Sequence, residues 1–377
     1  MIHIEKEHAC LLELLKYTLF NQPPVIPESI NWAKIFESAK AQCIVPLLAS
    51  TIPLEYREEW NGIYYQSKAY IMQMLYEQNL LVKLFRDNNI PIVILKGTAA
   101  AVYYPNPLLR TFGDIDFYIC EESLECARKL LEQNEYIFDL KNERHYEYTK
   151  HGIEFELHTR FSCEHYNDID QILLLGMNDS IDYKISNYSF PGLPANENGI
   201  ILLGHIMQHL YDSGIGLRQI IDWMMFVHKE LDDSAWEKRF KKLAIDAGLD
   251  ELAITVTYMC KKWLGLPDDI TWCNSADDET ADNLLIRVLD DGNFGRDRAP
   301  YESVKSLIHN EGVFKYLQRA GMENWSLAQK YKIFRPFAWI YQLWRFSHKG
   351  LVSLAKGKKV FMKDKNKNVE KALKKRN

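Results

Sequence analysis

Two aspartates, Asp114 and Asp116, stand one residue apart in a short run of alternating polar and apolar residues. The apolar residues Ile115, Phe117 and Ile119 occupy every second position, which is the period of a β-strand with one buried face. Both carboxylates then project from the same face, and a cation between them relieves their mutual repulsion. Mg²⁺ prefers hard oxygen ligands of this kind and is often shared with the phosphates of a substrate. The pair therefore predicts a metal site for phosphoryl or nucleotidyl transfer.

A second acidic pair follows on a later predicted strand. Glu154 and Glu156 alternate with apolar residues over 153–158, so they share one strand face with His158. A third carboxylate from this strand would complete a site for two metal ions, which can hold a triphosphate and lower the pKa of an acceptor hydroxyl. The spacing alone allows either glutamate. For His158 we expect either a hydrogen bond that supports a carboxylate or an ordinary structural role.

Four residues that precede the aspartates in the chain, Lys96, Gly97, Thr98 and Arg110, are suited to phosphate binding. The apolar run 92–95 predicts a buried strand that passes through Lys96-Gly97-Thr98 into a helix. Free N–H groups at a helix start attract anions, Gly97 lets a phosphate come close, and the Thr98 hydroxyl can donate to it. Arg110 offers a rigid fork of donors to phosphate oxygens. Each feature has an alternative, because the turn can need a glycine for its shape alone and Lys96 or Arg110 can pair with a carboxylate.

Together these residues resemble the polymerase β-like nucleotidyltransferase superfamily, and more narrowly a bacterial branch of uncharacterised nucleotidyltransferases. The resemblance extends over residues 91–230 and rests on Leu95-Lys-Gly-Thr98, Tyr104, Arg110, Gly113-Asp-Ile-Asp116, Glu156-Leu-His158, His205-Ile-Met-Gln-His209 and Gly216-Leu-Arg-Gln-Ile-Ile-Asp222. In that superfamily a Gly-Gly or Gly-Ser turn opens a helix under the triphosphate. Three acidic residues from two strands bind two Mg²⁺ ions.

The resemblance implies a role for each matching position. Asp114, Asp116 and Glu156 match the metal ligands and catalytic residues, and this match is what favours Glu156 over Glu154. Gly97 and Thr98 match the phosphate turn. The chain departs from the usual pattern in three ways: the turn is Gly-Thr behind a lysine, the stretch between turn and aspartates is long, and the third acid is a glutamate.

A histidine pair lies further along the chain. His205 and His209 are four residues apart and so share one face of a predicted helix. This spacing can bind zinc, but Ile206 stands where His-Glu-x-x-His enzymes carry their essential glutamate. We expect the two histidines to contact nucleotide or acceptor, together with Arg218 and Asp222. The alternative is core-edge packing with an interhelix salt bridge.

The elements that must position these residues predict an α+β fold. We expect an N-terminal helical region over 1–90, a small mixed-sheet core over 91–190, a larger helical domain over 191–350 and a basic tail over 351–377. Strands are predicted near 92–95, 109–119, 136–140, 145–149, 153–158 and 181–188. Helices are predicted over 8–20, from Asn31 onward, and over 58–87 as one helix or two, then over 99–104, 121–134, 196–212, 216–231, 234–247, 250–264, 278–291, 302–320 and 328–347.

Composition narrows the class of protein. The seven cysteines include no Cys-x-x-Cys pair, which predicts neither a disulfide framework nor a structural zinc site. No apolar run is long enough to cross a bilayer and the start of the chain lacks a signal-peptide pattern, so we expect a cytoplasmic protein with no membrane partner. The net charge is −5, although the segment from Lys356 to Asn377 has ten Lys and Arg against two acidic residues. Nucleic acid is therefore expected only at this tail or as an acceptor.

The leading functional hypothesis is transfer of a nucleoside monophosphate from an NTP, most simply ATP, to an acceptor hydroxyl with release of pyrophosphate. Two Mg²⁺ ions are the expected cofactor, with Mn²⁺ as an alternative, and the acceptor is not identified. A metal-dependent glycosyltransferase using Asp-x-Asp is a second hypothesis, although such folds place a longer parallel α/β region before the motif. A non-catalytic nucleotide-binding module is the third, and clustered buried charge argues against it.

Overall fold

In the computed structural model the chain separates into two compact units, residues 1–297 and 298–377. The described residues are 2, 4–141, 145–161, 167–212, 214–293, 317–318, 322 and 332–341. Of the second unit they include little more than a short 3₁₀ helix, η6, over Lys332–Phe337. The predicted helices 302–320 and 328–347 lie largely outside the described residues, and the basic tail lies wholly outside them.

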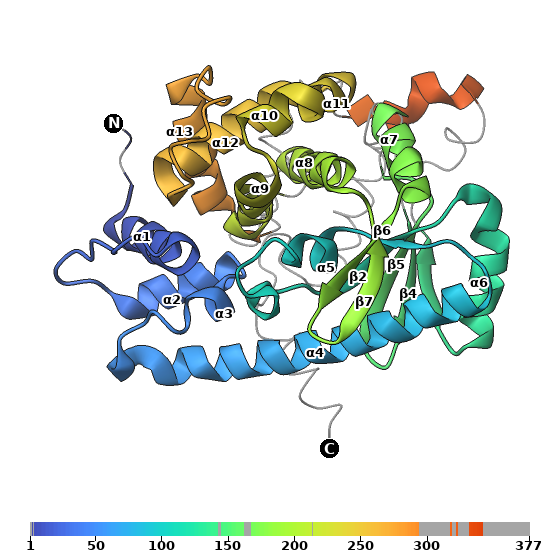
Figure 1. Ribbon diagram of the computed structural model, residues 1–377, viewed down its shortest axis with the longest axis horizontal. Helices are drawn as coiled ribbons and strands as arrows, with labels where there is room; N and C mark the ends of the chain where they lie inside the picture. The colour runs from blue at the N-terminus through green and yellow to red at the C-terminus, as the bar shows by residue number, and fades with distance from the viewer. Residues whose placement is uncertain are drawn as a thin grey trace. The chain divides into compact units, whose positions relative to one another are not determined.

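The first unit contains a seven-stranded mixed sheet, which confirms the predicted α+β class (Figure 1). The strand order is β3–β4–β5–β2–β1–β7–β6. Strand β2 runs parallel to β5 and β1 parallel to β7, while the other neighbours are antiparallel. The strands are β1 Val93–Ile94, β2 Asp114–Tyr118, β3 Ile137–Lys141, β4 His145–Lys150, β5 Ile153–His158, β6 Ile181–Ile185 and β7 Tyr188–Gly192.

Alternation along the two central strands separates a core face from a polar face. Ile115 and Phe117 of β2 and Phe155 of β5 are buried in one hydrophobic cluster. The long helix α4 (Arg57–Asp87) packs into the same cluster, and the rings of Phe85 and Phe117 meet edge to face at 5.6 Å. Asp114 and Asp116 alternate with these core residues, so they emerge on the opposite face. One strand thus supplies both the core and the acidic pair.

The N-terminal helices follow the predicted pattern. They are α1 Lys6–Phe20, α2 Trp32–Ala41 and α3 Val45–Leu48, followed by the 3₁₀ helix η1 Leu54–Tyr56 and by α4. The side chain of Asn31 accepts a hydrogen bond from the Lys34 N–H, which confirms Asn31 as the cap of α2. Of the two predicted alternatives for 58–87, the structure forms one helix of 31 residues, and Figure 1 shows α4 passing along the sheet.

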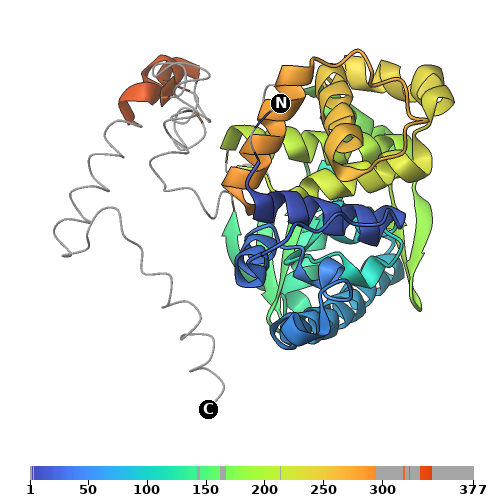
Figure 2. The same ribbon diagram turned by 90° about the vertical axis from the view of Figure 1, so that its left-hand side faces the viewer.

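Most of the later helices pack with α1 in a second hydrophobic cluster, whereas the helix over 124–133 packs in the first. Figure 2 shows α1, in dark blue, beside the yellow and orange helices. Helix α8 contacts α5, α7 and α9, and α9 in turn contacts α5 and α12. These helices are α5 Lys96–Ala101, α6 Leu124–Gln133, α7 Asn167–Asn178, α8 Ala195–Asp212, α9 Leu217–Glu230, α10 Asp233–Ala235, α11 Lys241–Asp246, α12 Asp250–Leu264 and α13 Asp278–Asp291, with short 3₁₀ helices η2 Pro107–Leu109 and η3 Glu121–Ser123. No helix in the described ranges has both the length and the apolar character that crossing a membrane requires.

The structure corrects several predicted elements. The single strand predicted over 181–188 is the hairpin β6–β7, because Ser186 takes a left-handed φ of 54° and turns the chain. The helix predicted over 99–104 begins three residues earlier, at Lys96. The helix predicted over 234–247 is interrupted by a π-helical turn, η4, over Trp236–Phe240. Helix α7 was not predicted.

Candidate active site

Three carboxylates converge at the centre of the sheet. Parallel pairing of β2 with β5 sets Asp116 directly opposite Glu156 and Asp114 opposite Glu154. Asp114, Asp116 and Glu156 each offer an oxygen, and these oxygens all lie within 4.8 Å of one another. Glu154 is exposed instead. The structure therefore brings together the three acidic residues that the sequence singled out, and it separates Glu156 from Glu154.

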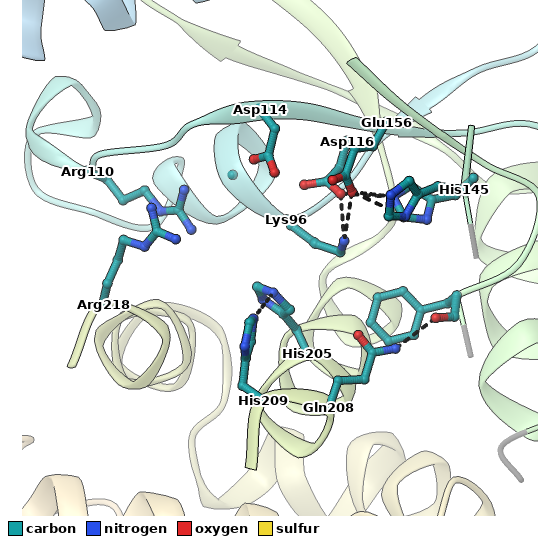
Figure 3. A pocket seen from close by; sticks show the side chains of 13 residues that line it. Lys96, Arg110, Asp114, Asp116, His145, Glu156, His205, Gln208, His209 and Arg218 are labelled. Atoms are coloured by element: carbon teal, nitrogen blue, oxygen red, sulfur yellow. Dashed lines mark hydrogen bonds and ion pairs between the residues drawn. The ribbon is translucent and has the colours of Figure 1, made fainter. Parts of the chain in front are cut away.

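The carboxylates face a cavity of about 190 Å³ between the polar face of the sheet and helices α8 and α9 (Figure 3). Eight of the nine predicted site residues line this cavity. Thr98, which is buried, is the exception and is not part of the lining. The lining residues are Lys96, Gly97, Arg110, Asp114, Asp116, His145, Glu156, His158, Phe161, His205, Gln208, His209 and Arg218.

Lys96 supplies a positive charge inside the acidic cluster. Its Nζ donates to Asp116 Oδ1 at 2.6 Å and lies 4.0 Å from Glu156 Oε2. Burial acts to lower the pKa of Lys96, but the two carboxylates outweigh burial and raise it. The lysine takes a left-handed φ of 45°, which is unfavourable for a residue with a side chain and is typical of functional sites. Of the two roles open to Lys96, the structure shows the carboxylate contact.

The pKa values of the three carboxyl groups are shifted in different directions. Burial raises the pKa of Asp114, and the nearby charge of Asp116 raises it further. The pKa of Glu156 is raised by the same two causes. For Asp116, burial acts in the same direction, but Lys96 and a 2.9 Å contact with His158 Nε2 hold its pKa well below the ordinary range. Two of the three acids thus remain poorly compensated within the described structure.

Two arginines meet at another side of the cavity. Arg110 Nε and Nη2 donate to the two oxygens of Asp222 at 3.0 and 2.6 Å, and Tyr104 Oη donates to the same carboxylate at 2.7 Å. Arg218 donates to the Thr111 carbonyl at 3.0 Å. Figure 3 shows both guanidinium groups turned toward the cavity. Burial, together with the neighbouring charge of Arg110, lowers the pKa of Arg218.

Asp222 is therefore the residue that orients Arg110, whereas the Thr111 carbonyl accepts from Arg218. It is buried beneath the cavity rather than in its lining, and its salt bridge joins it to Arg110, which follows η2, rather than to a residue of another helix. A bidentate contact fixes the plane of the Arg110 guanidinium. Two fixed cations that face one cavity form a natural site for a multiply charged anion.

The predicted histidine pair lies on helix α8 and lines the cavity. The Nε2 atoms of His205 and His209 are 2.8 Å apart, so one ring donates to the other. Burial, with His209 beside it, holds the pKa of His205 well below its usual value. Next to the pair, Gln208 donates to the Phe161 carbonyl at 2.8 Å. These contacts place polar ring edges opposite the acidic strands.

Sequence reasoning missed three lining residues, His145, Phe161 and Gln208. His145 could not be placed from the sequence, because its partner depends on the exact turn between the strands. In the structure β4 ends at Lys150 and β5 begins at Ile153, and this register sets His145 opposite His158. Phe161 follows β5, and Gln208 lies beside the histidine pair on α8.

Comparison with known proteins agrees with this geometry. Residues 28–265 match a family described as uncharacterised nucleotidyltransferase. The match includes every residue that lines the cavity and extends over more than half of the chain. No curated protein gave a match. The chain belongs to the family of uncharacterised nucleotidyltransferases.

Proposed function

We propose that the protein moves a nucleoside monophosphate from an NTP, with ATP as the expected donor, to an acceptor hydroxyl and releases pyrophosphate. The observation that carries this proposal is the division of one cavity into two charged parts. Asp114, Asp116 and Glu156 form the acidic part, while Arg110 and Arg218 form the basic part. The acidic part suits divalent cations and the basic part suits phosphate oxygens.

The acidic residues fit a hard divalent ion. Their oxygens lie within 4.8 Å of one another on adjacent strands. Burial and mutual repulsion raise the pKa of Asp114 and Glu156, and Lys96 makes its short contact with Asp116 alone among these three. Asp114, Asp116 and Glu156 would hold Mg²⁺, as two ions, or Mn²⁺. When bound, such ions neutralise phosphate charge and lower the pKa of the acceptor hydroxyl.

The phosphates are expected to lie between Gly97 and the two arginines. A Cβ atom at Gly97 would stand tightly against Phe112 Cβ at 3.3 Å and in ordinary contact with Arg110 Nη1 at 3.5 Å, so it would fill space beside the guanidinium. Asp222 fixes Arg110 in advance, which reduces the loss of side-chain entropy when an anion binds. This pre-organisation favours a ligand with several negative charges.

The reaction itself is a substitution at phosphorus. The acceptor oxygen forms a bond to the α-phosphorus while the bond to the oxygen that leads to the β-phosphate breaks, and pyrophosphate leaves with that oxygen. The hydroxyl proton passes to a base. We assign this role to Glu156, because its carboxylate lines the cavity beside the proposed ions. We place the nucleobase or the acceptor beside His205 and His209, on the wall opposite the carboxylates.

The test compares two acidic substitutions that lie opposite each other on neighbouring strands. Asp114→Asn removes a lining carboxylate, whereas Glu154→Gln removes the exposed carboxylate across from it. Each protein is incubated with Mg²⁺, labelled ATP and a cell extract that supplies acceptors, and pyrophosphate release is measured. We expect Asp114→Asn to lose roughly 100-fold or more of the rate and Glu154→Gln to keep it. Equal release by wild type and Asp114→Asn would overturn the proposal.

A further inference from the structure

A second ligand set combines Glu156 with two histidines, His158 on the same strand and His145 on β4, which lies on the other side of β5 from the aspartates. His145, Glu156 and His158 each offer one ligand atom, and these atoms all lie within 4.8 Å of one another. His145 Nδ1 is 3.5 Å and His158 Nε2 is 3.4 Å from the same oxygen, Glu156 Oε2. Ligand atoms about 2.0–2.1 Å from a tetrahedral ion stand roughly 3.3 Å apart, so the spacing is close to that of a coordination site.

The sheet holds these residues rigidly. Strands β4 and β5 pair so that His145 stands opposite His158 and Glu147 stands opposite Glu156. Residues two apart on a strand share a face, so the four side chains lie on the same side of one hairpin. The rings of the two histidines contact at 5.0 Å between centroids. A site built on paired strands keeps its geometry better than one built on loops.

Hydrogen bonding at His145 turns its second nitrogen toward Glu156. Its Nε2 lies 2.9 Å from Glu147 Oε1. A carboxylate can only accept, so Nε2 donates, and in a neutral ring Nδ1 then carries a lone pair. This lone pair faces the Glu156 oxygen, which is also an acceptor. A cation between them converts this unfavourable contact into two ligand bonds, and Glu147 is then the outer carboxylate that commonly orients a metal-bound histidine.

The charge around Glu156 leaves a place for that cation. Among the described residues, its contacts with basic side chains are 3.4 Å to His158, 3.5 Å to His145 and 4.0 Å to Lys96. All three exceed the length of a charge-assisted hydrogen bond, which is about 2.7–2.9 Å. Lys96 stays on Asp116, so Asp116 keeps a cationic partner if His158 turns to an ion.

We propose that His145, Glu156 and His158 form a binding site for a first-row transition-metal ion of the zinc class, separate from the carboxylate site and sharing only Glu156 with it. Imidazole nitrogens select such ions over Mg²⁺, which prefers oxygen ligands. Two histidines and one carboxylate leave a further coordination position open, as in catalytic zinc sites. The cavity that the three residues line gives a small ligand access to that position.

The test is calorimetric titration of the intact protein with Zn²⁺ alone. We expect His145→Gln to weaken Zn²⁺ binding by at least about tenfold, and Glu147→Gln by roughly 10–100-fold, because it removes the carboxylate that orients His145. His151→Gln is the control, because His151 pairs with Glu77 away from the cavity and should bind Zn²⁺ as wild type does. Circular dichroism confirms that each variant is folded. Wild-type Zn²⁺ affinity in His145→Gln would overturn the proposal.

Asp114→Asn separates this proposal from the proposed reaction. Asp114 belongs to the carboxylate set and not to the histidine set. A variant that loses pyrophosphate release but keeps its Zn²⁺ affinity supports both sites. If Asp114→Asn loses Zn²⁺ and His145→Gln keeps it, zinc binds the carboxylates and the second site is refuted. If Asp114→Asn keeps pyrophosphate release, the proposed reaction fails while the Zn²⁺ titration still decides the histidine site.

Discussion

Replacement of Lys96 by methionine tests whether its ammonium group compensates the buried charge of Asp116. The substitution keeps the length of the side chain and removes the ammonium that lies 2.6 Å from Asp116. Both side chains are largely buried, with 12% and 4% of their area exposed. Breaking such a pair by removing one partner leaves a buried charge uncompensated and typically costs 3–5 kcal/mol. His158 still donates to Asp116, so we expect a loss of about 3 kcal/mol without divalent ions.

Divalent ions should reverse most of this loss. A ligand at 100 times its Kd stabilises the folded state by about 2.7 kcal/mol. In Lys96→Met an ion at the carboxylates takes over the role of the ammonium, so this stabilisation should nearly restore wild-type stability. In the wild-type protein the ion must first displace Lys96 from Asp116. A displacement cost of about 1.4 kcal/mol would make the Kd for Mg²⁺ tenfold higher in the wild type than in the variant.

The assay is urea denaturation of both proteins with and without Mg²⁺, in which circular dichroism monitors unfolding. Lys241→Met provides the control, because its pair with Glu237 is exposed and should change the free energy of unfolding by no more than about 0.5 kcal/mol. Equal stability of Lys96→Met and wild type without divalent ions would show that the ammonium does not compensate the Asp116 charge. A variant that Mg²⁺ fails to stabilise would show that no ion takes over the role of the ammonium.

Three other substitutions test separate parts of the site. Asp222→Asn leaves the buried Arg110 without its carboxylate and should cost about 3–5 kcal/mol in urea denaturation; a loss below 1 kcal/mol would contradict the buried pair. Burial and His209 depress the pKa of His205, so below about pH 6.5 the unfolded chain binds a proton that the folded protein does not. The free energy of unfolding therefore falls by up to about 1.4 kcal/mol per pH unit as the pH drops below about 6.5. His205→Gln should make that slope shallower, and an unchanged slope would contradict the assignment. Gly97→Ala should weaken ATP binding in calorimetry, because its Cβ crowds the space beside Arg110, while wild-type affinity would place the phosphates elsewhere.

The acidic strand could be predicted well because local and long-range constraints agree there. Ile115 and Phe117 alternate with the aspartates, and burying them leaves a single orientation for both carboxylates. The hairpin β6–β7 could not be read in the same way. Its two-residue turn, Ser186-Asn187, places Ser186 in the left-handed region, and the glycine that most often marks such a turn is absent. The helix start at Lys96 was obscured for the same reason, since a lysine takes the left-handed conformation there.

The choice between Glu154 and Glu156 was beyond the residue pattern. Both lie on the same strand face, and only the pairing of β5 with β2 sets Glu156 beside Asp116. The partner of Arg110 was equally hidden, because Asp222 lies 112 residues away on α9. Contacts of this kind depend on how helices pack onto the sheet, which hydrophobic periodicity does not specify. Periodicity thus predicted which face carries the charges, while tertiary packing decides which charges meet.

Anomalous diffraction from crystals grown with Mn²⁺ and a non-hydrolysable ATP analogue would locate the proposed metal and phosphate positions directly. We expect Mn²⁺ density bounded by Asp114, Asp116 and Glu156, with the phosphates of the analogue extending toward Gly97, Arg110 and Arg218. Nucleotide bound elsewhere, or a cluster in which Lys96 keeps Asp116 and no Mn²⁺ joins the three carboxylates, would contradict the proposed function.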